Sequence, residues 1–156
     1  MVNKKDLLVM AYLRQNARMK LTTMSRLTRL PVSTIFDRMK HHEGGLIKRH
    51  ICLLDFAMLG FHTRAKIMLK VGKKDKQSVR DYMHNNHNVN SIYKINNGYD
   101  FLAEVVFRNI SDLEEFIENM EEKFDIKNKE VHYIIDDIKR ESFMSNPDTL
   151  ELLDIS

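Results

Sequence analysis

Residues 22–42 read TTMSRLTRLPVSTIFDRMKHH and predict two short helices joined by a tight turn. The first helix covers residues 22–28, begins at a Thr22 or Thr23 cap, and points Met24 and Leu27 inward. Pro31 disfavours helical geometry at the residue before it, so the chain turns at that point. Two helices this close together have the geometry of a helix-turn-helix.

The second helix of the pair is predicted to begin at Val32 or Ser33 and to end near His42. Ile35 and Met39 are four residues apart and therefore face the core together. Gly44 and Gly45 then end the helix. The other faces carry polar or charged side chains, namely Ser33, Thr34, Asp37, Arg38, Lys40 and His41.

The flanks of this pair extend the prediction to a small DNA-binding domain. An amphipathic helix is expected over residues 4–16, because apolar side chains cover a broad face of it. Residues 46–54 are interpreted as the strand of a wing, and residues 55–62 as a hinge. We therefore expect a winged helix-turn-helix domain over residues 1–54.

Charge is unevenly distributed along the 156 residues. Residues 1–50 hold eleven Lys or Arg against three Asp or Glu, whereas the remainder holds 14 against 19. A basic region of this kind favours binding to a polyanion such as nucleic acid. The acidic remainder of the chain does not favour such binding.

The second half of the chain has a different periodicity. Over residues 64–71 small or apolar side chains (Ala65, Ile67, Leu69, Val71) alternate with Arg64, Lys66, Met68 and Lys70, which predicts a half-buried strand. A helix capped by Asp75 follows, then strands over 89–95 and 99–107 around a turn at Asn96-Asn97-Gly98. Ser111 and Glu114 form an expected capping box for a second helix, and a last strand covers 130–135.

This order, β-α-β-β-α-β, predicts a ferredoxin-like domain over residues 63–140, so the fold class is α+β. Two helices should cover one face of its sheet. The other face, carrying Met68, would be free to form a dimer. Residues 141–156 are expected to be a tail with a short helix after Asn146-Pro147.

Four stretches, taken in order, resemble the leucine-responsive and asparagine-regulator family (Lrp/AsnC). They are Leu30 to Ile35, Gly45 to Ile47, Leu53 to Phe61, and the glycine-tyrosine-aspartate signature within Asn97 to Leu102. The sequence departs from the family at His42, where leucine is usual, and at Gly44, where a longer charged helix end is usual. The recognition helix also carries fewer arginines than is usual in the family.

The resemblance implies a transcription regulator whose third helix enters the major groove of double-stranded DNA. Ser33, Thr34 and Arg38 are expected near base edges or phosphates, with Asp37 on the same helix, while Lys40 and His41 meet the backbone. Further phosphate contacts are predicted for Lys20, Arg26, Lys48 and Arg49.

One helix reads only a few base pairs, so a homodimer on a pseudo-palindrome is expected. The family implies further assembly to tetramers or octamers.

The same resemblance implies a second site at Gly98, Tyr99 and Asp100. By residue chemistry alone, Asn97-Gly98 predicts only a hairpin turn. In the family, this loop lines an amino-acid effector site between dimers, where Asp100 would hold the α-amino group or order the loop.

Several other functions find no support in the sequence. It has no P-loop, no glycine-rich dinucleotide turn and no nucleophile elbow, so we expect neither an enzyme nor a cofactor. The histidine pairs lack further ligands at metal-binding spacing. Cys52 is the only cysteine, and there is no signal peptide or long apolar run, which together favour the cytoplasm.

Three alternative functions remain open at this point. The first is an architectural DNA protein of low sequence specificity. The second is an amino-acid-sensing allosteric subunit that does not bind DNA, and the third is an RNA binder using strand aromatics.

Overall fold

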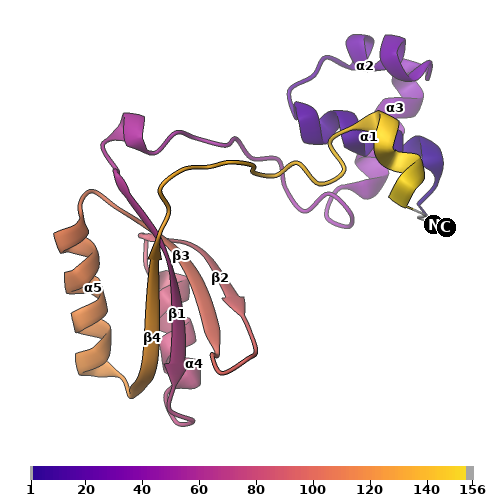
Figure 1. Ribbon diagram of the computed structural model, residues 1–156. Helices are drawn as coiled ribbons and strands as arrows, with labels where there is room; N and C mark the ends of the chain where they lie inside the picture. The colour runs from indigo at the N-terminus through magenta and orange to yellow at the C-terminus, as the bar shows by residue number, and fades with distance from the viewer. Residues whose placement is uncertain (1, 154–156) are drawn as a thin grey trace. The chain divides into compact units, whose positions relative to one another are not determined.

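The computed structural model describes residues 2–153 and divides into two compact units, whose relative placement is not determined (Figure 1). The chain leaves the first unit after Leu53 and rejoins it at Ile138. Residues 54–137 form the second unit. Among the described residues, no helix combines the length and the apolar character needed to cross a membrane.

The first unit, here called the helical unit, contains α1 (Lys4–Gln15), α2 (Leu21–Thr28) and α3 (Val32–His42). Asn3 caps α1 in a capping box with Asp6. The Asn3 side chain accepts the backbone N–H of Asp6, and the Asp6 side chain accepts the backbone N–H of Asn3. The helices pack around one small core, formed by Val9, Met10, Leu13, Met24 and Ile35.

The helix-turn-helix prediction is confirmed, with local differences. α2 begins at Leu21 and has no side-chain cap, so neither Thr22 nor Thr23 caps it. Arg29 ends α2 in the left-handed conformation, with φ 56°. Leu27 was expected to point inward but is 47% exposed. Its helix packs on α3 through Met24, one turn earlier.

The predicted wing strand over residues 46–54 is wrong. Only an isolated bridge between Glu43 and Ile47 forms there, and residues 48–53 are exposed without regular structure. A strand requires a neighbour to satisfy its backbone groups, and within the described chain no other strand pairs with this segment. In the predicted hinge, the short 3₁₀ turn η1 (Ala57–Leu59) ends at Gly60, with φ 87°.

The second unit, here called the α/β unit, has the predicted β-α-β-β-α-β order. Its elements are β1 (Thr63–Val71), α4 (Lys76–Asn85), β2 (Val89–Lys94), β3 (Phe101–Phe107), α5 (Ile110–Lys123) and β4 (Ile126–Tyr133). The strands form one antiparallel sheet in the order β2-β3-β1-β4. The ferredoxin-like fold is therefore confirmed.

α4 and α5 cover one face of this sheet (Figure 1). Alternate residues of β1, such as Ile67 and Leu69, face the helices and are fully buried, as the period of two requires. The predicted helix caps differ from the observed ones. Asn109 caps α5 in place of Ser111, because its side chain already accepts the N–H of Asp112 at 2.9 Å. Asp75 precedes α4 but its carboxylate binds the N–H of Asp125 instead.

The C-terminal tail belongs to the helical unit. It leaves the sheet after β4, contacts α1, and forms the 3₁₀ helix η2 (Pro147–Leu153) at the predicted position. Arg14 of α1 donates to the carbonyl oxygens of Phe143, at 2.8 Å, and Glu141, at 2.9 Å. Figure 1 shows this segment, in yellow, beside α1. The helical unit is therefore built from both ends of the described chain.

Candidate nucleic-acid and effector sites

One side of α3 is open to solvent. Ile35 is fully buried and Met39 packs against the same core, so they fix which side of the helix faces inward. Thr34 is half-buried. The predicted DNA-contact residues that remain exposed on this helix are Ser33, Asp37, Lys40 and His41. Ser33 lies in the first turn without capping the helix, because Pro31 occupies the cap position.

Arg38 does not share this exposed position. Its Nη1 atom lies 2.5 Å from Oδ1 of Asp6 and 3.1 Å from Oδ1 of Asn3, so the guanidinium joins α3 to the start of α1. Nε2 of the buried His42 lies 3.2 Å from the same oxygen of Asp6. Arg38 is therefore engaged within the protein, where the sequence suggested a free side chain.

The Asp6 carboxylate is held ionised by this arrangement. Burial alone would raise its pKa, but the Asn3 N–H and the Arg38 guanidinium outweigh burial and lower the pKa below its ordinary value. A buried carboxylate that stays charged needs a permanent partner. Arg38 supplies it.

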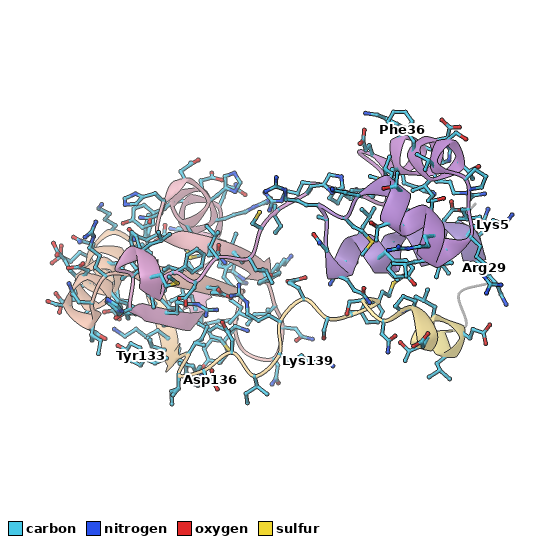
Figure 2. The ribbon with its side chains drawn as sticks, turned by 90° about the horizontal axis from the view of Figure 1, so that it is seen from above. Lys5, Arg29, Phe36, Tyr133, Asp136 and Lys139 are labelled. Atoms are coloured by element: carbon cyan, nitrogen blue, oxygen red, sulfur yellow. The ribbon has the colours of Figure 1, made fainter. Side chains whose placement is uncertain are left out.

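Phe36 is a surface residue that the sequence analysis did not select. Its ring is 49% exposed, and Nζ of Lys40 lies 5.9 Å from the ring centroid. Figure 2 shows the side chain pointing away from the helices of its unit. The available signal was the helical period, which places Ile35 and Met39 inward and turns Phe36 off that face. An exposed aromatic side chain on a predicted recognition helix can contact a thymine methyl group.

The remaining predicted phosphate contacts are all exposed. Lys20 is at the N-cap of α2, Arg26 is in the last turn of α2, and Lys48 and Arg49 follow the Glu43–Ile47 bridge. Within residues 2–153, none of these four side chains forms an ion pair or hydrogen bond. Their charges are available to a polyanion.

The predicted effector loop lies between β2 and β3. Asn97 and Gly98 form its turn in the left-handed region, with φ 59° and 92°. A Cβ atom built on Gly98 would meet no atom within 4 Å. The glycine is thus required by backbone conformation rather than by close packing.

Asp100 fastens this loop to its surroundings. Its carboxylate accepts the N–H of Val71 at 2.9 Å and Nζ of Lys76 at 2.5 Å, and Nζ of Lys70 lies 3.7 Å away. Burial would raise the pKa of Asp100, but Lys76 and the Val71 N–H lower it on balance. Of the two roles considered for Asp100, the observed contacts are those of loop ordering.

Tyr99 extends over the sheet face that the helices leave open. Its hydroxyl donates to Glu130 and accepts from Nδ2 of Asn128, at 3.1 Å, and both partners lie on β4, which β1 separates from β3 in the sheet. The hydrogen bond to Glu130 raises the pKa of the Tyr99 phenol. The hydroxyl therefore links the loop before β3 to β4.

Metal binding finds no support in the described part of the chain. No group of three or more His, Cys, Asp or Glu residues is arranged there to hold a metal ion.

The α/β unit matches a known family. The family model described as the Lrp/AsnC ligand binding domain matches residues 64–143, about half of the chain. The loop at Gly98, Tyr99 and Asp100 lies inside the matched region.

Individual relatives agree with this match. The chain is 25% identical over 114 residues to the HTH-type transcriptional regulator FL11 of Pyrococcus furiosus, covering 72% of this chain and 76% of the relative. FL11 of Pyrococcus horikoshii is similar to the same extent.

Solved structures show the same fold over most of the chain. A transcriptional regulator of Neisseria meningitidis in complex with L-Met superposes with a TM-score of 0.82 at 17% identity, covering 90% of this chain and 94% of the other. E. coli AsnC superposes with a TM-score of 0.78 at 18% identity, covering 90% and 97%.

Proposed function

The chain belongs to the Lrp/AsnC family of transcriptional regulators, which are not enzymes, and we propose that its helical unit binds double-stranded DNA through the exposed side of α3. The observation that carries this proposal is that α3 follows a tight turn, buries Ile35 and packs Met39 against the core, leaving its polar side open. The basic charge of residues 1–50 is matched to a phosphate backbone.

The side chains have different expected roles at the DNA. Ser33 and Thr34, in the first turns of α3, are assigned to base edges or phosphates. Phe36 is assigned to an apolar base edge, and Lys40 and His41 to the backbone. Lys20, Arg26, Lys48 and Arg49 add phosphate contacts. Asp37 lies exposed on α3 beside the residues that face the DNA.

Arg38 has a different assignment. Its Nη1 atom compensates the buried charge of Asp6, a structural role that the exposed side chains of α3 do not have. We therefore assign Arg38 to holding α3 on α1, and assign sequence reading to its neighbours.

Selection of genomic fragments by the purified protein, followed by sequencing, tests this function. A shared inverted-repeat motif is expected. Lys40→Gln should weaken binding and reduce the salt dependence of log K by about one phosphate contact. Phe36→Ala should lower the preference for the motif over unrelated DNA. Lys94→Gln, an exposed lysine of β2, is the control.

Other outcomes would contradict a sequence-specific regulator. Tight binding without a shared motif would support the architectural alternative. Absence of binding even at low salt would favour a sensing subunit that acts without DNA.

We also propose that the α/β unit binds an amino acid or a related small effector at the loop of Gly98, Tyr99 and Asp100. The support is the match to the ligand binding domain and the similar fold of the regulator solved with L-Met. Here Gly98 sets the turn, Asp100 orders the loop, and Tyr99 presents its hydroxyl beside Glu130.

Thermal unfolding with single amino acids, beginning with L-methionine, tests this site. A bound effector raises the Tm with its concentration. Gly98→Ala, which strains the left-handed turn, should remove the increase. Gly60→Ala is a matched control, because Gly60 also has a positive φ with open space around it. A panel in which no amino acid raises the Tm would exclude this effector class.

The protein is further proposed to act as a homodimer in the cytoplasm, with larger assemblies built from dimers. The open sheet face carries Met68 opposite Leu102 and Val106 opposite Arg64, and Tyr93 is 57% exposed beside Leu102. Val106→Lys should raise the dimer dissociation constant at least tenfold by sedimentation, by placing a charge on this face. Ser111→Lys, on an exposed part of α5, adds the same charge elsewhere and should not.

A further inference from the structure

The helical unit contains a cavity that is separate from the proposed effector loop. Its volume is about 410 Å³, and its walls come from α1, residues 46–53 and the C-terminal tail. All of its lining residues lie in the helical unit. This volume is within the range of small-molecule sites, roughly 300–1,000 Å³.

Most of the cavity lining is apolar. Met10 and Leu13 contribute from α1, Ile47 and Ile51 from the following segment, and Met144 from the tail. Two of these side chains are flexible thioethers, which adapt to irregular ligands. The interior therefore favours an aliphatic group.

One wall of the cavity is fixed in place by hydrogen bonds. Arg14 donates to the Phe143 carbonyl, to the Glu141 carbonyl and to a Glu141 carboxylate oxygen, at 2.8, 2.9 and 3.2 Å. The tail is thereby held beside α1 without any ligand. These contacts also pair the charges of Arg14 and Glu141, which removes both from consideration as ligand partners.

Two cations of the lining keep their charge unpaired. Lys48 and Arg49 line the cavity, are exposed to solvent, and form no ion pair or hydrogen bond within the described residues. An apolar interior with two unpaired cations matches a ligand that has an aliphatic chain and an anionic head. A cationic ligand does not fit this lining.

We propose that this cavity is a binding site for a medium-chain aliphatic carboxylate. The alkyl chain lies between Met10, Leu13 and Met144, and the carboxylate meets Lys48 and Arg49 at the solvent side. The site is independent of the amino-acid effector proposed for the α/β unit.

Occupation of this site has a consequence for DNA binding, which rests on the proposed function. Lys48 and Arg49 are also assigned to DNA phosphates, so a bound carboxylate competes with DNA for the same two charges. The ligand should weaken DNA binding most strongly at low salt, where phosphate contacts contribute most.

Methionine methyl NMR of the full chain tests the site without DNA. With ¹³C-methyl methionine, octanoate below its micelle-forming concentration should shift the Met10 and Met144 signals saturably. Met83 and Met120, buried in the α/β core, serve as internal controls. Decanoate should bind about tenfold more tightly than octanoate, because it buries two more methylene groups.

Charge substitutions then test the anionic head. The double variant Lys48→Gln with Arg49→Gln should weaken octanoate binding about tenfold and leave 1-octanol binding unchanged. Lys20→Gln with Arg26→Gln removes one lysine and one arginine of the same unit that do not line the cavity. That control should bind octanoate like the original chain.

Three results would overturn the proposal. Met10 and Met144 signals that do not respond to octanoate exclude the ligand class. Equal binding of octanoate and octyltrimethylammonium excludes the role of the cations. If the Met10 and Met144 chemical shifts change with protein concentration and do not change when octanoate is added, a second copy of the chain fills the cavity. None of these outcomes depends on whether the protein binds DNA.

Discussion

At the scale of single residues, the Asp6 carboxylate is a buried charge that joins two helices of the helical unit. It is 3% exposed and is compensated by Arg38 across the α1–α3 contact. Removing one partner of a buried ion pair leaves the other charge without compensation. Asp6→Ala should therefore destabilise the helical unit by about 3 kcal/mol in denaturant unfolding.

Asp37→Ala is the matched control for this variant, because Asp37 is exposed on the same helix as Arg38. It should change stability by less than about 0.5 kcal/mol. Equal effects of the two substitutions would show that the buried pair contributes no more than a surface carboxylate.

The lowered pKa of Asp6 gives this stabilisation a defined pH dependence. Because the folded pKa lies below the unfolded value, the contribution is complete above about pH 4 and is lost as pH falls through the folded pKa. Unfolding followed at pH 6 and pH 3 should show a smaller acid-induced loss in Asp6→Asn than in the original chain. An identical loss in both would assign the acid sensitivity to other carboxylates.

At the scale of elements, the turn before β3 depends on one side chain. The Asp100 carboxylate accepts from Val71 and Lys76 and so ties the turn to β1 and α4. Asp100→Asn removes the charge from these hydrogen bonds, and should cost about 2 kcal/mol. Hydrogen exchange should accelerate at the Val71 amide. Asp81→Asn, on the exposed side of α4, should leave that amide protected.

Elements with strong local periodicity were predictable, and elements that depend on distant partners were not. Ala65, Ile67 and Leu69 occupy every second position, between Arg64, Lys66, Met68 and Lys70, so β1 and its buried face follow from sequence spacing alone. The wing strand failed because extended residues become a strand only beside a neighbour. Arg38 was assigned to DNA because its partner Asp6 lies 32 positions away, and no local pattern connects them.

The candidate sites divide in the same way. Exposure of Ser33, Lys40 and His41 follows from the helical period of α3. The contacts by which Asp100 orders the loop require β1 and α4 to be in place. The family resemblance implied loop ordering only as one of two roles for Asp100, the other being to hold an α-amino group. The tail's position beside α1 has no local signal, since it results from Arg14 reaching backbone carbonyls more than 120 positions away.

At the scale of the whole molecule, the α/β unit is inserted between two parts of the helical unit. Both connections leave the same end of the sheet, because β1 begins beside the end of β4, with Ala65 opposite Tyr133. Residues 54–62 and the segment after β4 are therefore the two connections between the units. Arg14 anchors the second connection within the helical unit, because it holds residues 141 and 143 to α1.

Arg14→Ala should release the tail without unfolding the α/β unit. We expect faster hydrogen exchange in α1 and in residues 141–153, a loss of about 1 kcal/mol from the helical unit, and unchanged exchange in β1 and β3. Arg18→Ala, just beyond α1, is the control. A tail that exchanges rapidly in the original chain as well would show that Arg14 does not hold it.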